Sequence, residues 1–277
     1  MKLILFSKSQ RERSVPELIA LAHEAGLDGY DLCVRPEYLV NPDNVATALP
    51  EAARLFRAEG LDVPLVTGNF DLLGPDSPSA EPILAAMEAA AIPFLKLGYF
   101  EYHPEQQAYW PEVDRVRRVL EAWEEPARRH AVCITYHTHS HRCLGVNCAA
   151  LMHLLQGRDP ACLGAYLDPA HMLVEGEEWA VGVAMVREYL RLVALKDVRL
   201  TREEKNGHGH CVTHWVAAGE GMVDWTAVFD ELLRIGFDGP LSVHCELEVP
   251  PEELHAAVLH EARFFRAQLD AASNRLA

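Results

Sequence analysis

The sequence lacks the features that mark secreted, disulfide-bonded or membrane proteins. Its seven cysteines are odd in number and scattered, and no two form a CxxC pair. This usage indicates a reducing compartment rather than a disulfide framework. No apolar run approaches the roughly 20 residues that a membrane helix needs. The opening MKLILFSKSQ has only four apolar residues in a row. It is too short for a secretory segment, so we expect a buried first strand and a cytoplasmic protein.

Basic charge is also scarce. Against 41 acidic residues there are 25 Lys and Arg, which gives a net charge of −16. Such a field repels phosphate backbones and disfavours binding to nucleic acids or anionic membranes, although it leaves room for a small anion bridged by a metal. No GxGxxG motif follows the first apolar run, which argues against a dinucleotide-binding open sheet.

What the chain does contain is a regular alternation of short β-type runs and amphipathic helical segments. Each of eight strand candidates is followed by a helix candidate, a pattern that implies parallel pairing. Eight such units in roughly 250 residues predict a single (β/α)8 TIM-barrel domain spanning residues 1–277. The expected strands are 3–7, 29–34, 63–68, 94–100, 133–139, 163–168, 192–197 and 241–246. The expected helices are 14–26, 49–60, 81–91, 112–130, 147–157, 177–190, 225–236 and 252–272.

Polar residues gather where the predicted strands end, which is where barrel enzymes place their chemistry. They are Lys96, His137, His139, Asp168, His171, Lys196, Asp197, His244 and Glu246. Because strand side chains alternate between faces, His137 shares a face with His139, and His244 with Glu246. If both pairs point inward, they converge with Asp168. Mixed imidazole and carboxylate donors on rigid strand ends suit a divalent first-row metal.

Plainer interpretations stay open for several of these residues. A single histidine at a strand end is more often a hydrogen-bonded structural residue than a ligand. His141 and the HGHCVTH stretch, residues 208–214, are expected to lie in loops, the latter a mobile loop rather than a second metal site. Lys196 and Asp197 could form only a buried ion pair.

The motifs GLDGYDL, YHTH, LDPAH, ALKD, AAGEGMVDW and GFDGPLSVHCELE together resemble the xylose isomerase-like TIM barrels over essentially the whole chain. That superfamily includes sugar-phosphate isomerases and epimerases, ketose 3-epimerases, hydroxypyruvate isomerase, inosose dehydratase and AP endonucleases of the endonuclease IV type. The most specific parts are Asp168-x-x-His171 and the pairing of GEGMVDW with GFDGPLSV.

The resemblance implies a metal site built from a Glu, an Asp, a His and a Glu on the last four strands. Only Asp168 is retained, because His137, Ala194 and His244 stand at the other three positions. The expected ligands are therefore His137, Asp168 and His244, a two-His-one-carboxylate set for Mn, Co, Mg, Fe or Zn. His171 matches the position that contacts substrate in the epimerases.

On this basis we expect a metal-dependent isomerase or epimerase of a small sugar, sugar acid or polyol ketone, acting through an enediolate. Glu246 or an uncoordinated histidine would be the base, and Lys196 would neutralise the oxyanion. His171 would hold a substrate hydroxyl. Further substrate contacts are expected from His139, Lys96 and Trp215.

Other functions stay in competition. The same enediolate can lose a β-hydroxyl, so a dehydratase is the nearest alternative. Replacement of three usual ligands also allows a metal-free, non-catalytic barrel that binds a sugar or acts as a scaffold. Phosphodiester hydrolysis is less favoured, because the chain is acidic. Barrels of this type often dimerise or tetramerise, which leaves a homo-oligomer open.

Overall fold

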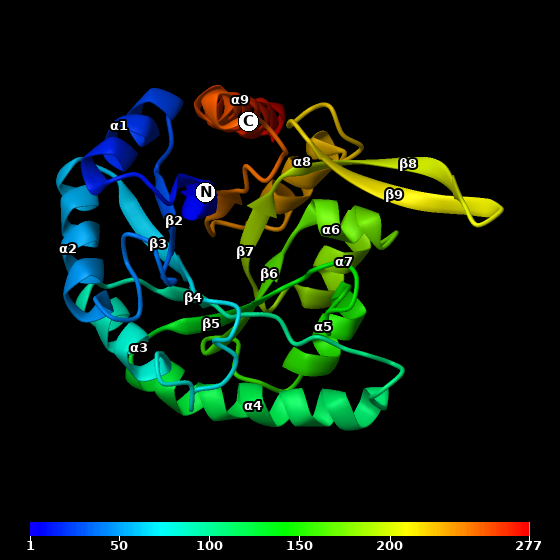
Figure 1. The fold of residues 1–277 in the computed structure, drawn as a ribbon, viewed down its shortest axis with the longest axis horizontal. Helices are drawn as coiled ribbons and strands as arrows, with labels where there is room; N and C mark the ends of the chain where they lie inside the picture. Colours follow the sequence, from blue (N-terminus) through cyan, green and yellow to red (C-terminus); the bar gives the residue numbers. More distant parts are fainter. Residues whose placement is uncertain (277) are drawn as a thin grey trace.

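Eight parallel strands close into a barrel in the computed structural model, which describes residues 1–276. Around the barrel their order is β1-β10-β7-β6-β5-β4-β3-β2. The strands are β1 Leu3–Phe6, β2 Gly29–Cys33, β3 Asp62–Thr67, β4 Phe94–Lys96, β5 Cys133–His137, β6 Leu163–Leu167, β7 Leu190–Leu195 and β10 Leu241–Val243. The predicted (β/α)8 architecture is therefore confirmed, and the helices form a ring outside the strands (Figure 1).

The predicted helices are all present. They are α1 Val15–Ala25, α2 Val45–Ala58, α3 Ala80–Ala89, α4 Tyr109–Arg129, α5 Cys148–Leu155, α7 Trp179–Val186, α8 Trp225–Arg234 and α9 Leu254–Leu276. A short α6, Pro169–Val174, and two 3-10 turns, Ser7–Gln10 and Pro251–Glu253, complete the set. Among these helices, none within residues 1–276 combines the length and the apolar character needed to cross a membrane.

The first helix shows how local sequence sets a boundary. The Glu17 carboxylate accepts a hydrogen bond from the Ser14 backbone N–H at 2.8 Å, the arrangement of a capping box. At the other end Gly26 has φ 66°, a left-handed conformation in which glycine lacks the Cβ clash of other residues.

The barrel interior changes from apolar to charged along its axis. Its lower layer is a buried cluster of Ile4, Leu65, Tyr166, Leu192 and Ala194. Above it the buried Asp31 carboxylate accepts hydrogen bonds from the Thr67 and Ser242 hydroxyls, at 2.6 and 3.0 Å. Burial raises the pKa of Asp31 to about 6. Strand alternation then places the next inward side chains at the carboxyl-end mouth of the barrel.

One predicted loop is a β-hairpin instead. Strands β8 Asp197–Lys205 and β9 His208–Val216 pair antiparallel and extend beyond the ring of helices (Figure 1). The expectation of a mobile loop over 208–214 was therefore wrong. Between the strands Asn206 and Gly207 have φ values of 55° and 79°, as in a type I′ turn, which Asn-Gly favours. This dipeptide was the available sequence signal.

Asp197 anchors this hairpin to the barrel rather than pairing with Lys196. Its buried carboxylate accepts from the backbone N–H groups of Val198, Gly219, Gly221 and Val223 at 2.8 to 3.3 Å. It also accepts from the Trp225 indole at 3.1 Å. A carboxylate that satisfies so many buried donors stabilises the connection between β9 and α8.

We therefore expect Asp197→Asn to lower the free energy of unfolding by about 2–3 kcal/mol, because an isosteric amide turns an NH2 group toward these donors. Urea denaturation measures the change. The matched control is Asp224→Asn at the exposed N-cap of α8, where an amide still caps and the expected cost is a few tenths of a kcal/mol. Equal losses in the two variants would contradict the anchoring role.

Candidate functional site

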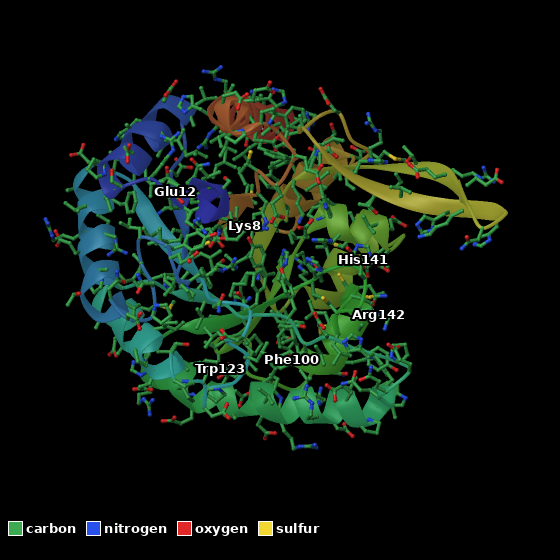
Figure 2. All side chains as sticks on the ribbon, viewed as in Figure 1. Lys8, Glu12, Phe100, Trp123, His141 and Arg142 are labelled. Carbon is green, nitrogen blue, oxygen red and sulfur yellow. The ribbon has the colours of Figure 1, made fainter. Side chains whose placement is uncertain are left out.

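The strand ends enclose one narrow cavity at the mouth of the barrel. Its volume is about 60 Å³, which holds only a few water molecules. It is lined by Phe6, Lys8, Arg35, Phe70, Lys96, Tyr99, His137, His139, Lys196, His244 and Glu246. Figure 2 labels Lys8 inside the ring of helices, whereas His141 lies outward on the side of α6.

A larger groove lies elsewhere, between α7, α8 and the start of α6. It measures about 730 Å³ and is lined by side chains such as Trp179, Met222 and Arg275. None of the strand-end residues predicted from the sequence lines it. Barrel enzymes place their chemistry at the carboxyl ends of the strands. Side chains at those ends line the narrow cavity, which is therefore the candidate site despite its smaller volume.

Lys196, at the end of β7, is the centre of the charge cluster beneath this cavity. Its ammonium lies 3.4 Å from Asp168 Oδ2 and 2.8 Å from Glu246 Oε2. It also lies 4.3 Å from the centroid of the Trp215 ring, a cation–π distance. Burial by itself lowers the pKa of Lys196, but the two carboxylates outweigh it and raise that pKa. The lysine is therefore a fixed positive charge at neutral pH.

His171 is held by the same ammonium. Lys196 Nζ lies 2.9 Å from His171 Nε2. The other ring nitrogen, Nδ1, lies 2.8 Å from the Ser140 hydroxyl and accepts from the Ser140 backbone N–H at 3.3 Å. The His139 ring packs on His171 with centroids 4.0 Å apart. Burial and the Lys196 charge lower the pKa of His171 well below its usual range, so this imidazole is neutral.

His137 and Asp168 present two buried polar atoms without hydrogen-bond partners among residues 1–276. These atoms, His137 Nε2 and Asp168 Oδ2, lie 3.6 Å apart. The other ring nitrogen of His137 is 2.9 Å from the Tyr99 hydroxyl. Asp168 Oδ1 accepts from the backbone N–H groups of Ala170 and His171, as the N-cap of α6. A buried polar atom without a hydrogen bond is costly, and Asp168 Oδ2 has only its 3.4 Å ion pair with Lys196, so this pair marks a place for a ligand atom.

His244 is turned away from that pair. Its Nε2 lies 2.9 Å from the Tyr166 hydroxyl, and its ring packs on Phe6 with centroids 4.5 Å apart. Tyr166 shares its buried cluster with Ala194, where the family pattern has a histidine. The small alanine leaves room in the barrel interior that the large phenol ring of Tyr166 helps to fill.

These side chains do not fit the three-ligand metal site predicted from the sequence. Within residues 1–276 no three His, Cys, Asp or Glu side chains are arranged to hold a metal ion. His137 and Asp168 face each other, but His244 Nε2 is engaged by Tyr166. The Lys196 ammonium already occupies the space beside Asp168. An ammonium has no lone pair to offer a metal and repels it.

Glu246 is held by cations on both sides. Its second carboxylate oxygen accepts from Lys8 at 2.5 Å, in addition to the contact with Lys196. Burial opposes ionisation, but the two ammonium groups and nearby His244 lower the pKa of Glu246 far below its usual range. A carboxylate this strongly paired is a weak base. His139 donates from Nδ1 to the Ser140 carbonyl at 3.1 Å, which leaves Nε2 as a proton acceptor. Burial and the nearby Lys196 charge lower the pKa of His139 to about 4.

Lys96, at the end of β4, has a different environment from Lys196. It is 3% exposed, donates to the Leu97 carbonyl at 3.2 Å and lies 4.2 Å from the Tyr99 ring centroid. No ion pair joins it to any carboxylate of residues 1–276, whereas Lys196 has two. Burial and the nearby Arg35 charge lower the pKa of Lys96 to about 7, only partly opposed by Asp31, Cys33 and Glu246.

The structure brings the predicted site residues together. Six of them line the cavity, namely Lys96, His137, His139, Lys196, His244 and Glu246, while Asp168, His171 and Trp215 contact Lys196. His141 is an exposed loop residue, as expected. Sequence reasoning missed five lining or contacting residues, Lys8, Arg35, Phe6, Tyr99 and Tyr166. The first two directly follow predicted strands, which was a usable signal. The tyrosines lay inside apolar runs and gave none.

Fold and site together define a (β/α)8 barrel with an ionised pocket at the carboxyl ends of its strands. Residues 19–268 match the family described as xylose isomerase-like TIM barrel. The chain belongs to this family, as the sequence motifs predicted.

The following relatives of the chain are distant in sequence. The inosose dehydratase of Lacticaseibacillus casei is 24% identical over 143 residues, 49% of this chain and 47% of that protein. The chain thus spans about half the length of the curated relatives it matches. A D-tagatose 3-epimerase-like protein superposes with a TM-score of 0.75 at 17% identity, over 100% of both chains. The IOLI protein, solved with a binding zinc atom, superposes at 0.70 and 15% identity, over 99% of each. At these identities the solved structures show the fold alone.

The pairing of Lys196 with Asp168 can be tested by a double-mutant cycle. We expect Lys196→Met to lower the free energy of unfolding by about 3–5 kcal/mol, because it leaves a fully buried carboxylate without its cation. In an Asp168→Asn background the same change should cost at least about 1 kcal/mol less. Urea denaturation supplies all four values.

A surface pair serves as the matched control. Lys2→Met breaks the exposed ion pair with Asp62 and should cost at most about 1 kcal/mol. Additive effects of Lys196→Met and Asp168→Asn would show that the two charges do not interact, contrary to the geometry.

Proposed function

We propose that this protein is an isomerase or epimerase that moves a proton at the carbon beside the carbonyl of a small sugar, sugar acid or polyol ketone. One observation carries the proposal: a fixed ammonium and a proton-accepting imidazole line one cavity at the barrel mouth, above two buried polar atoms without hydrogen bonds. Family membership supports the same class of chemistry, because the relatives named above include a tagatose epimerase-like protein and a dehydratase.

The two buried atoms without hydrogen bonds, His137 Nε2 and Asp168 Oδ2, are placed to bind a substrate hydroxyl. An oxygen placed about 2.8 Å from both His137 Nε2 and Asp168 Oδ2 would fit the 3.6 Å gap between them. With the Tyr99 hydroxyl donating to Nδ1, His137 carries its proton on Nε2 and donates it to that oxygen. The hydroxyl in turn donates to the carboxylate. Both buried atoms then gain the hydrogen-bond partner that they lack.

Lys196 and His139 would carry the proton transfer. As His139 Nε2 takes the proton from carbon, negative charge develops on the carbonyl oxygen, and the Lys196 ammonium balances it. Delivery of a proton to the opposite face by a second donor on that side gives an epimer. Delivery to the former carbonyl carbon, as the neighbouring hydroxyl proton passes to the former carbonyl oxygen, gives the isomer. Glu246 fixes Lys196 in place rather than acting as the base.

In this scheme the Lys196 ammonium supplies the positive charge that a metal ion could otherwise provide. No step is assigned to a metal, because the predicted ligands His137, Asp168 and His244 do not converge as a set. The cavity lining supports an anionic intermediate, since it contains four basic side chains, Lys8, Arg35, Lys96 and Lys196, and one carboxylate, Glu246. This concentration of positive charge occurs in a chain whose net charge is −16.

Dehydration is the second candidate. The same oxyanion can expel a hydroxyl from the next carbon, and the curated relative is an inosose dehydratase. Admission of either kind of substrate requires movement at the rim, because the cavity of about 60 Å³ is smaller than a sugar. Phe70, 55% exposed and packed on the Arg35 guanidinium at 4.5 Å, is placed to swing aside.

Deuterium incorporation tests the proposal directly, since isomerases, epimerases and dehydratases of this type share carbon–hydrogen cleavage. Ketohexoses, keto sugar acids and inosose are incubated with the protein in D2O and followed by proton NMR. We expect the proton NMR signal of the hydrogen on the carbon beside the carbonyl to disappear for at least one compound of this panel. His139→Gln should slow it by about 100-fold or more, in line with loss of a general base.

The product distinguishes the two candidates, because only dehydration yields an unsaturated or diketo compound. Tyr109→Phe, on the outer helix α4, is the control and should leave the exchange rate unchanged. No exchange with any panel member, or exchange that is undiminished in His139→Gln, would contradict the proposed chemistry.

A further inference from the structure

We propose that Lys96 forms a covalent imine with the carbonyl carbon of the substrate. The inference rests on the proposed function for the substrate class, a small hydroxy-carbonyl compound. It assigns to the site a covalent step that the proton-transfer scheme does not require.

The environment of Lys96 is that of a nucleophilic amine. Its ammonium form is disfavoured, because the side chain is buried and lies near the Arg35 guanidinium, and no carboxylate of residues 1–276 pairs with it. Lysines activated for imine formation are those desolvated in a pocket or placed beside another cation. Both conditions hold here.

The position is equally suitable. Lys96 is the last residue of β4 and lines the same cavity as His139 and Lys196. Within residues 1–276 the only hydrogen bond of its side-chain amine goes to the Leu97 carbonyl, at a long 3.2 Å. Little has to be broken before the amine can approach a carbonyl carbon. A rigid strand end also holds the nitrogen more precisely than a loop would.

Lys196 shows by contrast what a lysine that stays charged looks like in this cavity. It has two carboxylate partners and also contacts His171. Those contacts keep it charged, and a charged amine has no lone pair with which to attack. The two lysines therefore have different roles: Lys196 provides a fixed positive charge, and Lys96 provides the nucleophilic amine.

The chemistry balances without a redox partner. The amine lone pair attacks the carbonyl carbon and forms a carbon–nitrogen bond. The carbonyl oxygen then takes up the two protons that the nitrogen gives up and leaves as water, while the double bond to nitrogen forms. Protonation of the imine draws electrons from the neighbouring carbon and acidifies its hydrogen, which His139 can remove. Hydrolysis reverses the sequence and restores the amine.

Reductive trapping tests the inference in the wild-type protein. Full-length protein is incubated near pH 7 with dihydroxyacetone and sodium cyanoborohydride, which reduces an imine to a stable amine. It is then digested and analysed by peptide mass spectrometry. Lys205, at the exposed end of β8, serves as the internal reference in the same digest. We expect Lys96 to be labelled at least about tenfold faster than Lys205, because a larger fraction of its amine is neutral.

Two further arms complete the test. Lys96→Arg keeps the positive charge but should lose the fast-labelling site, and omission of dihydroxyacetone should leave every lysine unmodified. Labelling of Lys96 no faster than Lys205 would overturn the inference.

The result is separable from the proposed function. Deuterium exchange without trapping at Lys96 overturns the covalent step and leaves proton transfer standing. Trapping at Lys96 without exchange on any panel member supports the covalent site and contradicts the proton-transfer proposal.

Discussion

The candidate site depends on the Lys196 ammonium being held inside the barrel mouth. Burying a charge is expensive unless it is paired and hydrogen-bonded. Asp168, Glu246 and His171 together meet that requirement at 3.4, 2.8 and 2.9 Å. The positions of these three side chains and the position of Lys196 therefore depend on one another. Trp215, on strand β9 of the hairpin, lies over the same ammonium group. The hairpin between β7 and α8 therefore also contacts Lys196.

In this arrangement an ammonium group, rather than a metal ion, carries the positive charge. A metal ion draws several lone pairs to one point, whereas an ammonium donates hydrogen bonds outward to separate acceptors. The histidines accordingly face different partners: His171 lies against Lys196, His244 pairs with Tyr166, and His137 meets Tyr99. Burial keeps all three imidazoles neutral, since it lowers the pKa of each well below the usual range.

Much of this could be predicted from the sequence, because strand periodicity and the rule that barrel chemistry lies at strand ends are local patterns. They located Lys96, His137, Asp168, Lys196 and His244 correctly at one mouth. What each side chain contacts could not be predicted in the same way. Whether His244 faces a metal or a phenol depends on Tyr166, which reads as an ordinary apolar strand residue. The hairpin differs in this respect, because its Asn206-Gly207 turn is a local signal that lies within a polar, histidine-rich stretch lacking the apolar alternation of a buried strand.

The central claim, that lysine supplies the positive charge of this site, is tested most directly by elemental analysis. Protein is purified without chelators or a metal-affinity tag, incubated in turn with Mn, Fe, Co and Zn, and washed free of unbound ion. The account predicts far less than stoichiometric metal in every case, and no change on replacing His137 by alanine. A stoichiometric ion that is lost in His137→Ala would contradict it and restore the metal site that the sequence motifs first suggested.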